Sequence, residues 1–410
     1  MEEQKMEIID DINKLHALIE RYKTFYALQN YNISIDFSFK TLNETYYKHH
    51  QNHDVGFNDI KRSFLFENCT FEGVFEIPDN NKHNFEFIDC HFNKGFNVKN
   101  TKFEGKLKFR FCHFYETNFD NAVFQDLADF YRCEFHNTVI FFKTDFIGTT
   151  VFSASKFYEN VLFTYSLIEK LIIFRGTIFE KGLDLSLSIR QGDINCFDIQ
   201  LKDFESEIIN SLDEEYELTY DNCVSEEGLI PLKNKRETFR ILKHTLVSQN
   251  NISESIYFKV LEKNALKKEL DNKTYKQKVK NEKCTWWKER WFYVKNDLEK
   301  FNLWLNWISN QHGSSYGQAL FFILVVSVIS FYLSAISSNT FDFTWDLSWS
   351  TFKRGLSFFM QFLLLTHNFN YIDGDELKKA AVGYFIWDFC GRLIVGYGIY
   401  QFIQAFRKYR

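Results

Sequence analysis

The chain has 410 residues, of which 45% are hydrophobic and only 2 are proline, so it can bury a sizeable core and is neither collagen-like nor a proline-rich disordered chain. Its formal net charge of -5 excludes a global basic field of the kind that gathers nucleic acid. The 48 phenylalanines, against 8 tryptophans and 3 methionines, indicate an internal repeat.

Residues 1–60 are predicted to form an N-terminal helical cap that contains an amphipathic helix from Met6 to Leu28. The first residues, MEEQKMEIIDDINKLH, are acidic and lack the basic flank and apolar stretch of a secretory signal. We therefore expect this region to stay in the cytosol. In that reducing compartment the 8 cysteines are expected to be free.

From Phe119 to Leu185 an apolar residue, most often phenylalanine, recurs at alternating steps of five and six. The same spacing runs upstream from Phe87 to Phe114 with one slip before Phe119, and Phe66 and Phe71 open the series ahead of an insertion near Pro78. The residue two positions earlier is small or β-branched almost throughout. Helices and flat strands have periods of about 3.6 and 2, so neither explains the pattern. A coil that turns a corner at each step would close four sides in about 21 or 22 residues, with both positions inside. The predicted core includes Phe71, Phe92, Phe114, Phe135, Phe157 and Phe179.

The segments FENCTF, FIDCHF, FRFCHF and FYRCEF are similar to the repeats of pentapeptide-repeat proteins, which have a central Leu or Phe and a small residue two before it. The resemblance implies a right-handed quadrilateral β-helix over residues 61–190. About six coils at the roughly 4.8 Å spacing of paired strands would make a rod on the order of 30 Å long.

Four cysteines fall one coil apart and would form an inward column: Cys69, Cys90, Cys112 and Cys133. One interpretation of such a column is a metal site. No Cys-x-x-Cys pair is present, however, and His91 and His113 directly follow cysteines and therefore point outward. We interpret the thiols as small core side chains and predict no metal and no other cofactor.

Two connecting segments follow the coils. Residues 191–232 are predominantly acidic with little apolar periodicity, which predicts a solvated linker or a loose cap. Residues 233–280 are basic, carry apolar residues at helical spacing and break at Gln249 to Asn251, which predicts two antiparallel helices. This pattern resembles the helical hairpin that often follows pentapeptide repeats in bacterial membrane proteins. It is either a plain connector or a partner-binding surface.

Residues 281–315 alternate basic and tryptophan-rich pieces, a composition that fits either nucleic acid or a membrane interface. We favour the interface because a long apolar segment follows, and indole rings and lysines both suit the headgroup region. The predicted interfacial side chains are Trp286, Trp287, Trp291, Trp304 and Trp307.

Residues 316–410 predict two transmembrane helices, GQALFFILVVSVISFYLSAIS and AAVGYFIWDFCGRLIVGYGIYQFIQAF. Between them, Leu356 to Leu365 is too short to span and predicts a re-entrant segment, with a third membrane helix as the alternative. Basic residues before the first span and after the second predict both termini in the cytoplasm, at a bacterial inner membrane. Four loop residues run against that rule: Lys353, Arg354, Lys378 and Lys379.

This order of segments resembles the two-transmembrane pore module of potassium-channel-like proteins. In that family the filter Thr-Val-Gly-Tyr-Gly-Asp follows the re-entrant helix, whereas this chain has THNFNYIDGD. Coordination of potassium by backbone carbonyls is therefore not expected. The later Gly396-Tyr397-Gly398 is interpreted as a contact between helices.

Six polar residues are predicted as pore or gating residues: Asp388, Arg392, His367, Asp373, Asp375 and Glu376. Asp388 and Arg392 are four apart on one helical face, so they either form an ion pair or line a water-filled path. The three acidic loop residues would form a ring at the outer mouth of a symmetric oligomer.

The sequence therefore favours an oligomeric ion-channel-like protein, a tetramer by analogy, whose cytosolic repeat domain senses a signal or binds a partner and gates the pore. The alternatives are a membrane-tethered scaffold without conductance and, ranked lower, a DNA-mimicking topoisomerase-binding protein. The expected partners are membrane lipid, further copies of the chain and a cytosolic protein, and no nucleic acid. Motifs for phosphate cradling, nucleophilic catalysis or paired zinc ligands are absent from the sequence, so we predict no enzyme.

Overall fold

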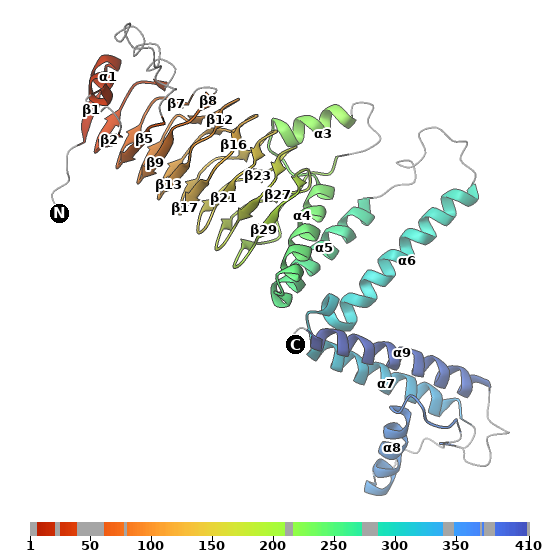
Figure 1. The fold of residues 1–410 in the computed structure, drawn as a ribbon. Coiled ribbons are helices and arrows are strands. Elements are labelled where there is room, and N and C mark those ends of the chain that lie inside the picture. The colour runs from red at the N-terminus through yellow and green to blue at the C-terminus, as the bar shows by residue number, and fades with distance from the viewer. Residues whose placement is uncertain are drawn as a thin grey trace. The chain divides into compact units, whose positions relative to one another are not determined.

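The computed structural model describes residues 6–20, 25–38, 61–77, 80–209, 216–272, 286–338, 348–369, 371–372 and 382–407. The described residues fall into two compact units, one up to Asn251 and one from Ile252 onward, and each is described by itself. The first unit is a β-solenoid with helices at its C-terminal end, and the second is helical (Figure 1).

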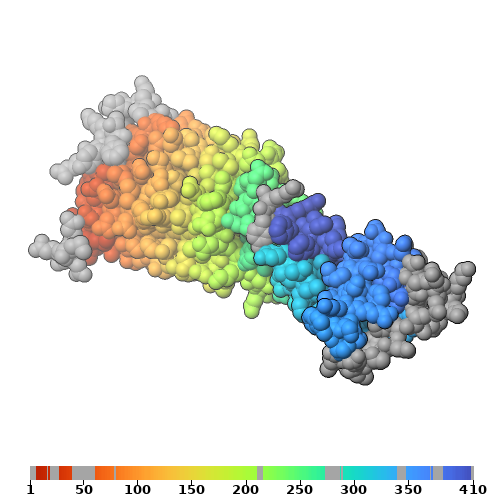
Figure 2. Space-filling view, turned by 90° about the horizontal axis from the view of Figure 1, so that it is seen from below, coloured from red at the N-terminus to blue at the C-terminus, as the bar shows by residue number. Residues whose placement is uncertain are grey.

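The longest face of the solenoid is a 9-stranded sheet of parallel strands. Its strands, in spatial order, are β1 (Glu7–Ile9), β3 (Tyr31–Ile33), β6 (Thr70–Phe71), β10 (His91–Phe92), β14 (His113–Phe114), β18 (Glu134–Phe135), β22 (Lys156–Phe157), β26 (Ile178–Phe179) and β30 (Gln200–Leu201). Figure 2 shows successive coils as bands of colour across the surface.

The other faces carry 8-, 6-, 4- and 3-stranded sheets. The 8-stranded sheet contains β2 (Phe25–Gln29), β5 (Ser63–Glu67), β9 (Asn84–Ile88), β13 (Leu107–Arg110), β17 (Ala128–Tyr131), β21 (Thr149–Val151), β25 (Leu171–Ile173) and β29 (Asp193–Asn195). The 6-stranded sheet contains β8 (Asn80–Asn81), β12 (Lys102–Phe103), β16 (Val123–Phe124), β20 (Asp145–Phe146), β24 (Leu167–Ile168) and β28 (Ile189–Arg190).

The two smallest sheets occupy the same place in the coil. They are β4 (Phe37–Ser38), β7 (Phe75–Glu76), β11 (Phe96–Asn97) and β15 (Thr117–Asn118), then β19 (Val139–Ile140), β23 (Val161–Leu162) and β27 (Leu183–Asp184). The break falls between β15 and β19, where two steps of five follow one another at Phe114, Phe119 and Phe124. The pairing is interrupted on this face only, because the 9-, 8- and 6-stranded sheets continue across the same coil.

Columns of stacked phenylalanine rings fill the solenoid. The six predicted core residues pair in register from coil to coil, and each is at most 2% exposed. Around Phe114, for example, the ring centroids of Phe92 and Phe135 lie 4.9 and 4.8 Å away. Close approach of neighbouring coils also requires glycine at position 148, where a Cβ would lie 2.0 Å from the carbonyl oxygen of Asp126. The predicted β-helix is confirmed as a solenoid.

The solenoid begins before residue 61, which differs from the predicted helical cap. The only helix in the described part of residues 6–38 is α1 (Ile12–Glu20), and the strands β1 and β2 flank it, so a continuous helix from Met6 to Leu28 is wrong. Leu28 pairs with Phe66 and Ile9 with Ile33. Backbone N–H and C=O groups at the edge of the following coil form hydrogen bonds with these strands. This pairing overrides the local helical pattern of the sequence.

The acidic segment is also more ordered than a solvated linker. It contributes β29, β30 and the helix α3 (Tyr216–Ser225), and Thr164 Oγ1 donates a hydrogen bond to the Val224 carbonyl at 2.7 Å. The helix α4 (Leu232–Ser248) then packs on β27, where Asn234 Nδ2 donates to Asp184 Oδ2 at 2.9 Å. Burial raises the pKa of this Asp184 carboxyl. These elements cover the last coils, as terminal caps of repeat proteins do.

The second unit contains α5 (Ile252–Asn272), α6 (Trp286–Asn310), the short 3-10 helix η2 (Gln311–Gly313), α7 (Tyr316–Ile336), α8 (Trp349–Phe362) and α9 (Val382–Phe406). The helices α4 and α5 separate at the predicted break, but they belong to different units, so their pairing as a hairpin stays a prediction. The helices α7 and α9 lie side by side along their length (Figure 1). Gly398 allows this contact, because a Cβ there would lie 2.7 Å from Ile323 Cγ1.

Among the described helices, α7 alone is long and apolar enough to cross a membrane. The second predicted span, α9, has 25 residues but does not reach the same hydropathy. Asp388 and Arg392 interrupt its apolar sequence, so composition supports one of the two predicted spans. The segment Leu356 to Leu365 lies in α8 and the turn after it, and its re-entrant position stays a prediction.

Candidate functional site

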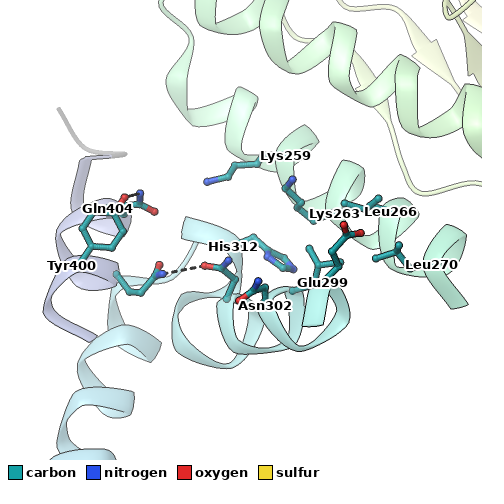
Figure 3. Close-up of a pocket in the computed structure, with 12 residues that line it drawn as sticks. Lys259, Lys263, Leu266, Leu270, Glu299, Asn302, His312, Tyr400 and Gln404 are labelled. Carbon is teal, nitrogen blue, oxygen red and sulfur yellow. Dashed lines mark hydrogen bonds between the residues drawn. The ribbon is translucent and has the colours of Figure 1, made fainter. Parts of the chain in front are cut away.

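A half-open pocket of about 420 Å³ lies within the helical unit, between α5, α6, η2 and α9 (Figure 3). Its lining comes from elements far apart in the sequence: Lys259, Lys263, Leu266 and Leu270 from α5, Glu299, Asn302, Leu303 and Asn306 from α6, His312 from η2, and Tyr400, Gln401 and Gln404 from α9. We call this the basic pocket, because two lysines face one glutamate.

A hydrogen-bond network brings these elements together. Asn310 Nδ2 donates to Gln401 Oε1 at 2.5 Å, and Gln401 Nε2 donates to Asn306 Oδ1 at 3.0 Å. Asn310 Oδ1 accepts from the Gly313 amide at 2.9 Å, which fixes the turn between α6 and α7. The three amide side chains therefore tie the C-terminal part of α9 to the end of α6. The sequence signal for this network is a pair of amides, Asn310 and Gln401, beside or within apolar helical segments, and it is not among the predicted site residues.

His312 lies at the strained point of this turn. Its backbone φ of 58° is left-handed, as is that of Gln311 at 50°. The side chain is 7% exposed, and burial, followed by the charges of Lys259 and Lys263, lowers its pKa to about 4. The imidazole is thus neutral at pH 7, and the positive charge of the pocket comes from the two lysines. Such a pocket suits an anionic group, which ammonium charges and amide donors would bind.

We expect this buried histidine to make the helical unit sensitive to acid. An unfolded chain protonates histidine near pH 6.5, whereas folded His312 stays neutral down to about pH 4. Between these values the unfolded state binds more protons, so stability is complete above pH 6.5 and falls as the pH approaches 4, by about 2 to 3 kcal/mol. Asparagine tolerates a left-handed backbone, so His312→Asn should remove the part of the acid-induced loss of stability that His312 causes.

The measurement is urea unfolding of the full chain, followed by tryptophan fluorescence at pH 7 and pH 4.5, for wild type and H312N. Carboxylates contribute equally to both proteins, so the difference between them reports His312. A wild-type midpoint that falls no further than that of H312N would contradict the prediction.

The residues predicted for a pore come together in a second cluster, between α9 and the turn that follows α8. Asp388 Oδ1 lies 2.9 Å from His367 Nε2, and its Oδ2 accepts from Arg392 Nε at 2.8 Å. The side chains of Asp388 and His367 are 0% and 3% exposed. The Arg392 guanidinium carbon lies 4.1 Å from the centre of the Phe369 ring. We call Asp388, His367 and Arg392 the charge cluster.

Two polar contacts position His367 in the charge cluster. Its Nδ1 lies 2.7 Å from the Leu364 carbonyl, and its Nε2 faces Asp388. The structure contains the predicted ion pair, and the Asp388 side chain is fully buried among the described residues.

Comparison with known families identifies the repeat. Residues 99–145, which lie within the solenoid, match a family model described as pentapeptide repeats (9 copies). The solenoid is a pentapeptide-repeat domain. A search of curated proteins and one of solved structures found no match to the chain.

The cysteine column belongs to the core of the pentapeptide-repeat domain. Cys90 Sγ donates to the Phe66 carbonyl at 3.4 Å and Cys112 Sγ to the Phe87 carbonyl at 3.5 Å. Both are buried, and burial raises their pKa values. The contact with Cys90, and then burial, raises the pKa of Cys69. These protonated thiols pack as small side chains.

Exposed aromatic and arginine side chains lie at a corner of the same domain. Phe111 is 44% exposed, and the Arg132 guanidinium carbon lies 5.6 Å from its ring centre. Both residues have a left-handed backbone, φ 57° and 54°, which turns the chain at the corner. Arg110 lies 5.1 Å from the Tyr131 ring and bonds Asp129 at 2.7 Å. Aromatic and arginine side chains are enriched in protein-binding hot spots.

The remaining predicted residues fall on α6 or outside the described residues. Trp287, Trp291, Trp304 and Trp307 are exposed on α6. Trp286 begins this helix, and its side chain lies outside the described part. Asp373, Asp375 and Glu376 also lie outside the described residues, so the acidic ring stays a prediction.

Proposed function

We propose that the chain is a membrane-anchored scaffold. In this proposal α7 and α9 form a hairpin in a bacterial inner membrane, and the pentapeptide-repeat domain and both termini lie on the cytoplasmic side. The domain then presents its exposed corner to a cytosolic protein. The single observation that carries the proposal is an apolar helical pair whose two charged residues, Asp388 and Arg392, form an ion pair.

The outer surfaces of α7 and α9 are apolar. Exposed side chains include Phe321, Val328 and Ile329 on α7 and Phe389 and Leu393 on α9. Exposed apolar surface of this kind favours lipid or another protein surface over water. The hydropathy of α9 is lowered by Asp388 and Arg392, but these bond each other and are 0% and 18% exposed. Pairing lowers the cost of placing charges in a bilayer, which supports α9 as a second span.

The helix α6 supports a membrane surface beside the hairpin. Five exposed apolar side chains recur at alternating steps of four and three and form one stripe: Trp287, Trp291, Val294, Leu298 and Phe301. Trp304 and Trp307 are exposed further along the helix. On another side, buried Asn296 donates to the Leu270 carbonyl of α5 at 3.3 Å. A helix with a tryptophan-rich stripe suits the headgroup region, where indole rings accumulate.

Membrane extraction of the full chain tests the anchor. We expect wild-type protein to float with liposomes and to stay in the membrane after alkaline carbonate washing. Val328→Lys places a charge on the lipid-facing side of α7 and should cost about 3 kcal/mol, roughly 100-fold in insertion. Val328→Leu is the matched control and should insert normally. Release of wild-type protein by carbonate, or equal insertion of the two variants, would contradict the anchor.

A second candidate is an oligomeric pore, and one observation favours it. The short helix α8 packs on α7 through Phe331 and Phe362, whose ring centres lie 5.9 Å apart. The turn after α8 then reaches α9 through His367. A helix and a turn between two long helices are the order expected of a pore module. Unitary conductance of purified oligomer in planar bilayers would establish this candidate, and a flat trace would leave the scaffold.

A further inference from the structure

Three side chains with metal-binding groups meet on the outer surface of the 9-stranded sheet. Phe114 and Phe135 point into the core, so the residues beside them, His113 and Glu134, point outward. His136 lies two residues after Glu134 and points to the same side. Pairing of β14 with β18 brings His113 directly beside Glu134. Among the described residues, this is a group whose ligand atoms all lie within 4.8 Å of one another.

The distance between the two imidazoles matches an edge of a tetrahedral metal site, and the two distances to Glu134 are somewhat longer. His113 Nδ1 lies 3.4 Å from His136 Nε2 and 3.7 Å from Glu134 Oε2, and His136 Nε2 lies 4.0 Å from Glu134 Oε2. Zinc bonds of about 2.0 to 2.1 Å at tetrahedral angles separate neighbouring ligands by about 3.3 to 3.5 Å. A small adjustment of the Glu134 side chain would complete three equal edges.

We propose that His113, Glu134 and His136 bind a divalent metal ion of the zinc class. Two imidazoles and a carboxylate are ligands that zinc prefers, whereas calcium and magnesium require oxygen ligands. The three side chains are 26% to 37% exposed, so an ion can enter and a fourth position remains open to water. This site goes beyond the proposed scaffold, because neither anchoring nor protein binding requires it.

Neighbouring rings fix the two imidazoles. His91 stacks on His113 with ring centres 4.5 Å apart, and Tyr115 and Tyr158 stack on either side of His136 at 4.4 and 4.9 Å. The Tyr158 hydroxyl also donates to Glu134 Oε2 at 2.9 Å. Such outer contacts orient ligands and raise metal affinity. Because the strands pair rigidly across coils, the ligands are positioned before an ion arrives.

The ammonium group of nearby Lys156 is not directed at the proposed metal ion, so it does not repel the ion at close range. Lys156, which pairs with Glu134 in the sheet, directs its ammonium group to Glu180 at 3.0 Å and over the Tyr158 ring. The cysteine column lies inside the solenoid with protonated thiols, so a metal bound outside would have no sulfur ligand. Spectroscopy can therefore distinguish the outer site from a thiolate site.

The test uses the full chain, purified without a histidine tag, and titrated with Co²⁺ as a spectroscopic substitute for zinc. We expect one equivalent to produce the visible absorption of four-coordinate Co²⁺ without thiolate charge-transfer bands, and Zn²⁺ to displace it. H113Q/H136Q should bind at least about tenfold more weakly, as should Glu134→Gln. His244→Gln is the matched control, since His244 is exposed on α4 and does not belong to the site or to the rings that stack on it, and should retain binding.

Chemical protection gives a second readout that needs no variant. Zn²⁺ should protect His113 and His136 of wild-type protein from diethylpyrocarbonate, and His91 should be protected less. The proposal is overturned if wild type and H113Q/H136Q bind Co²⁺ equally, if thiolate bands appear, or if Zn²⁺ leaves both histidines as reactive as before.

Discussion

Replacing Asp388 with leucine is expected to destabilise the helical unit by about 3 to 5 kcal/mol. Asp388 is fully buried and bonds both His367 and Arg392. Without the carboxylate, the guanidinium and the imidazole remain close together with no anion between them. Removing one partner of a buried ion pair costs far more than the pair itself contributes, because the remaining charge is uncompensated.

The double variant D388L/R392L is the matched control. It removes the charged pair together and leaves apolar side chains of similar volume, so it should regain most of the stability lost in D388L. The measurement is thermal unfolding of the full chain in detergent, followed by the fluorescence of the helical unit, whose Trp387 neighbours the cluster. A double variant as unstable as D388L would show that the uncompensated charge of Arg392 is not what destabilises D388L.

The same cluster shows how far the sequence could predict a site. The spacing of Asp388 and Arg392 on one helix is local, so their ion pair could be anticipated. The contact of His367 with Asp388 depends on the path of the turn after α8, which no local pattern encodes. The basic pocket was missed for a similar reason, because it needs α5, α6 and α9 to meet.

The solenoid was predictable where its repeat is regular and less so at its ends. In the middle, each coil repeats the same inward phenylalanine, and the pattern is independent of distant contacts. At the N-terminal end, Glu7–Ile9 and Tyr31–Ile33 become strands because an existing sheet edge pairs with them. At the other end, buried Ile194 and Leu201 continue the coils within an acidic sequence. Stacking on a preceding coil, not local propensity, decides these segments.

Phe114→Ala is expected to have the largest effect on the pentapeptide-repeat domain, about 3 to 5 kcal/mol. The ring is 1% exposed and lies between Phe92 and Phe135 in one column, with Phe109 at 5.1 Å from a neighbouring face. Its removal leaves a cavity that stacked coils cannot close, because each strand is paired in register above and below.

The destabilisation caused by Phe114→Ala should be local as well as large, because each coil contacts only its neighbours. Hydrogen exchange of the full chain should therefore show faster exchange in β10, β14 and β18 than in β26. Phe111→Ala is the matched control: the ring is 44% exposed at a corner whose equivalent position in another coil is Ala154, with the same φ of 57°. It should cost less than about 1 kcal/mol, mainly the contact with Arg132. If Phe111→Ala destabilised the domain as much as Phe114→Ala, or if exchange accelerated equally in β26, the stacked phenylalanine column would not be what stabilises the solenoid.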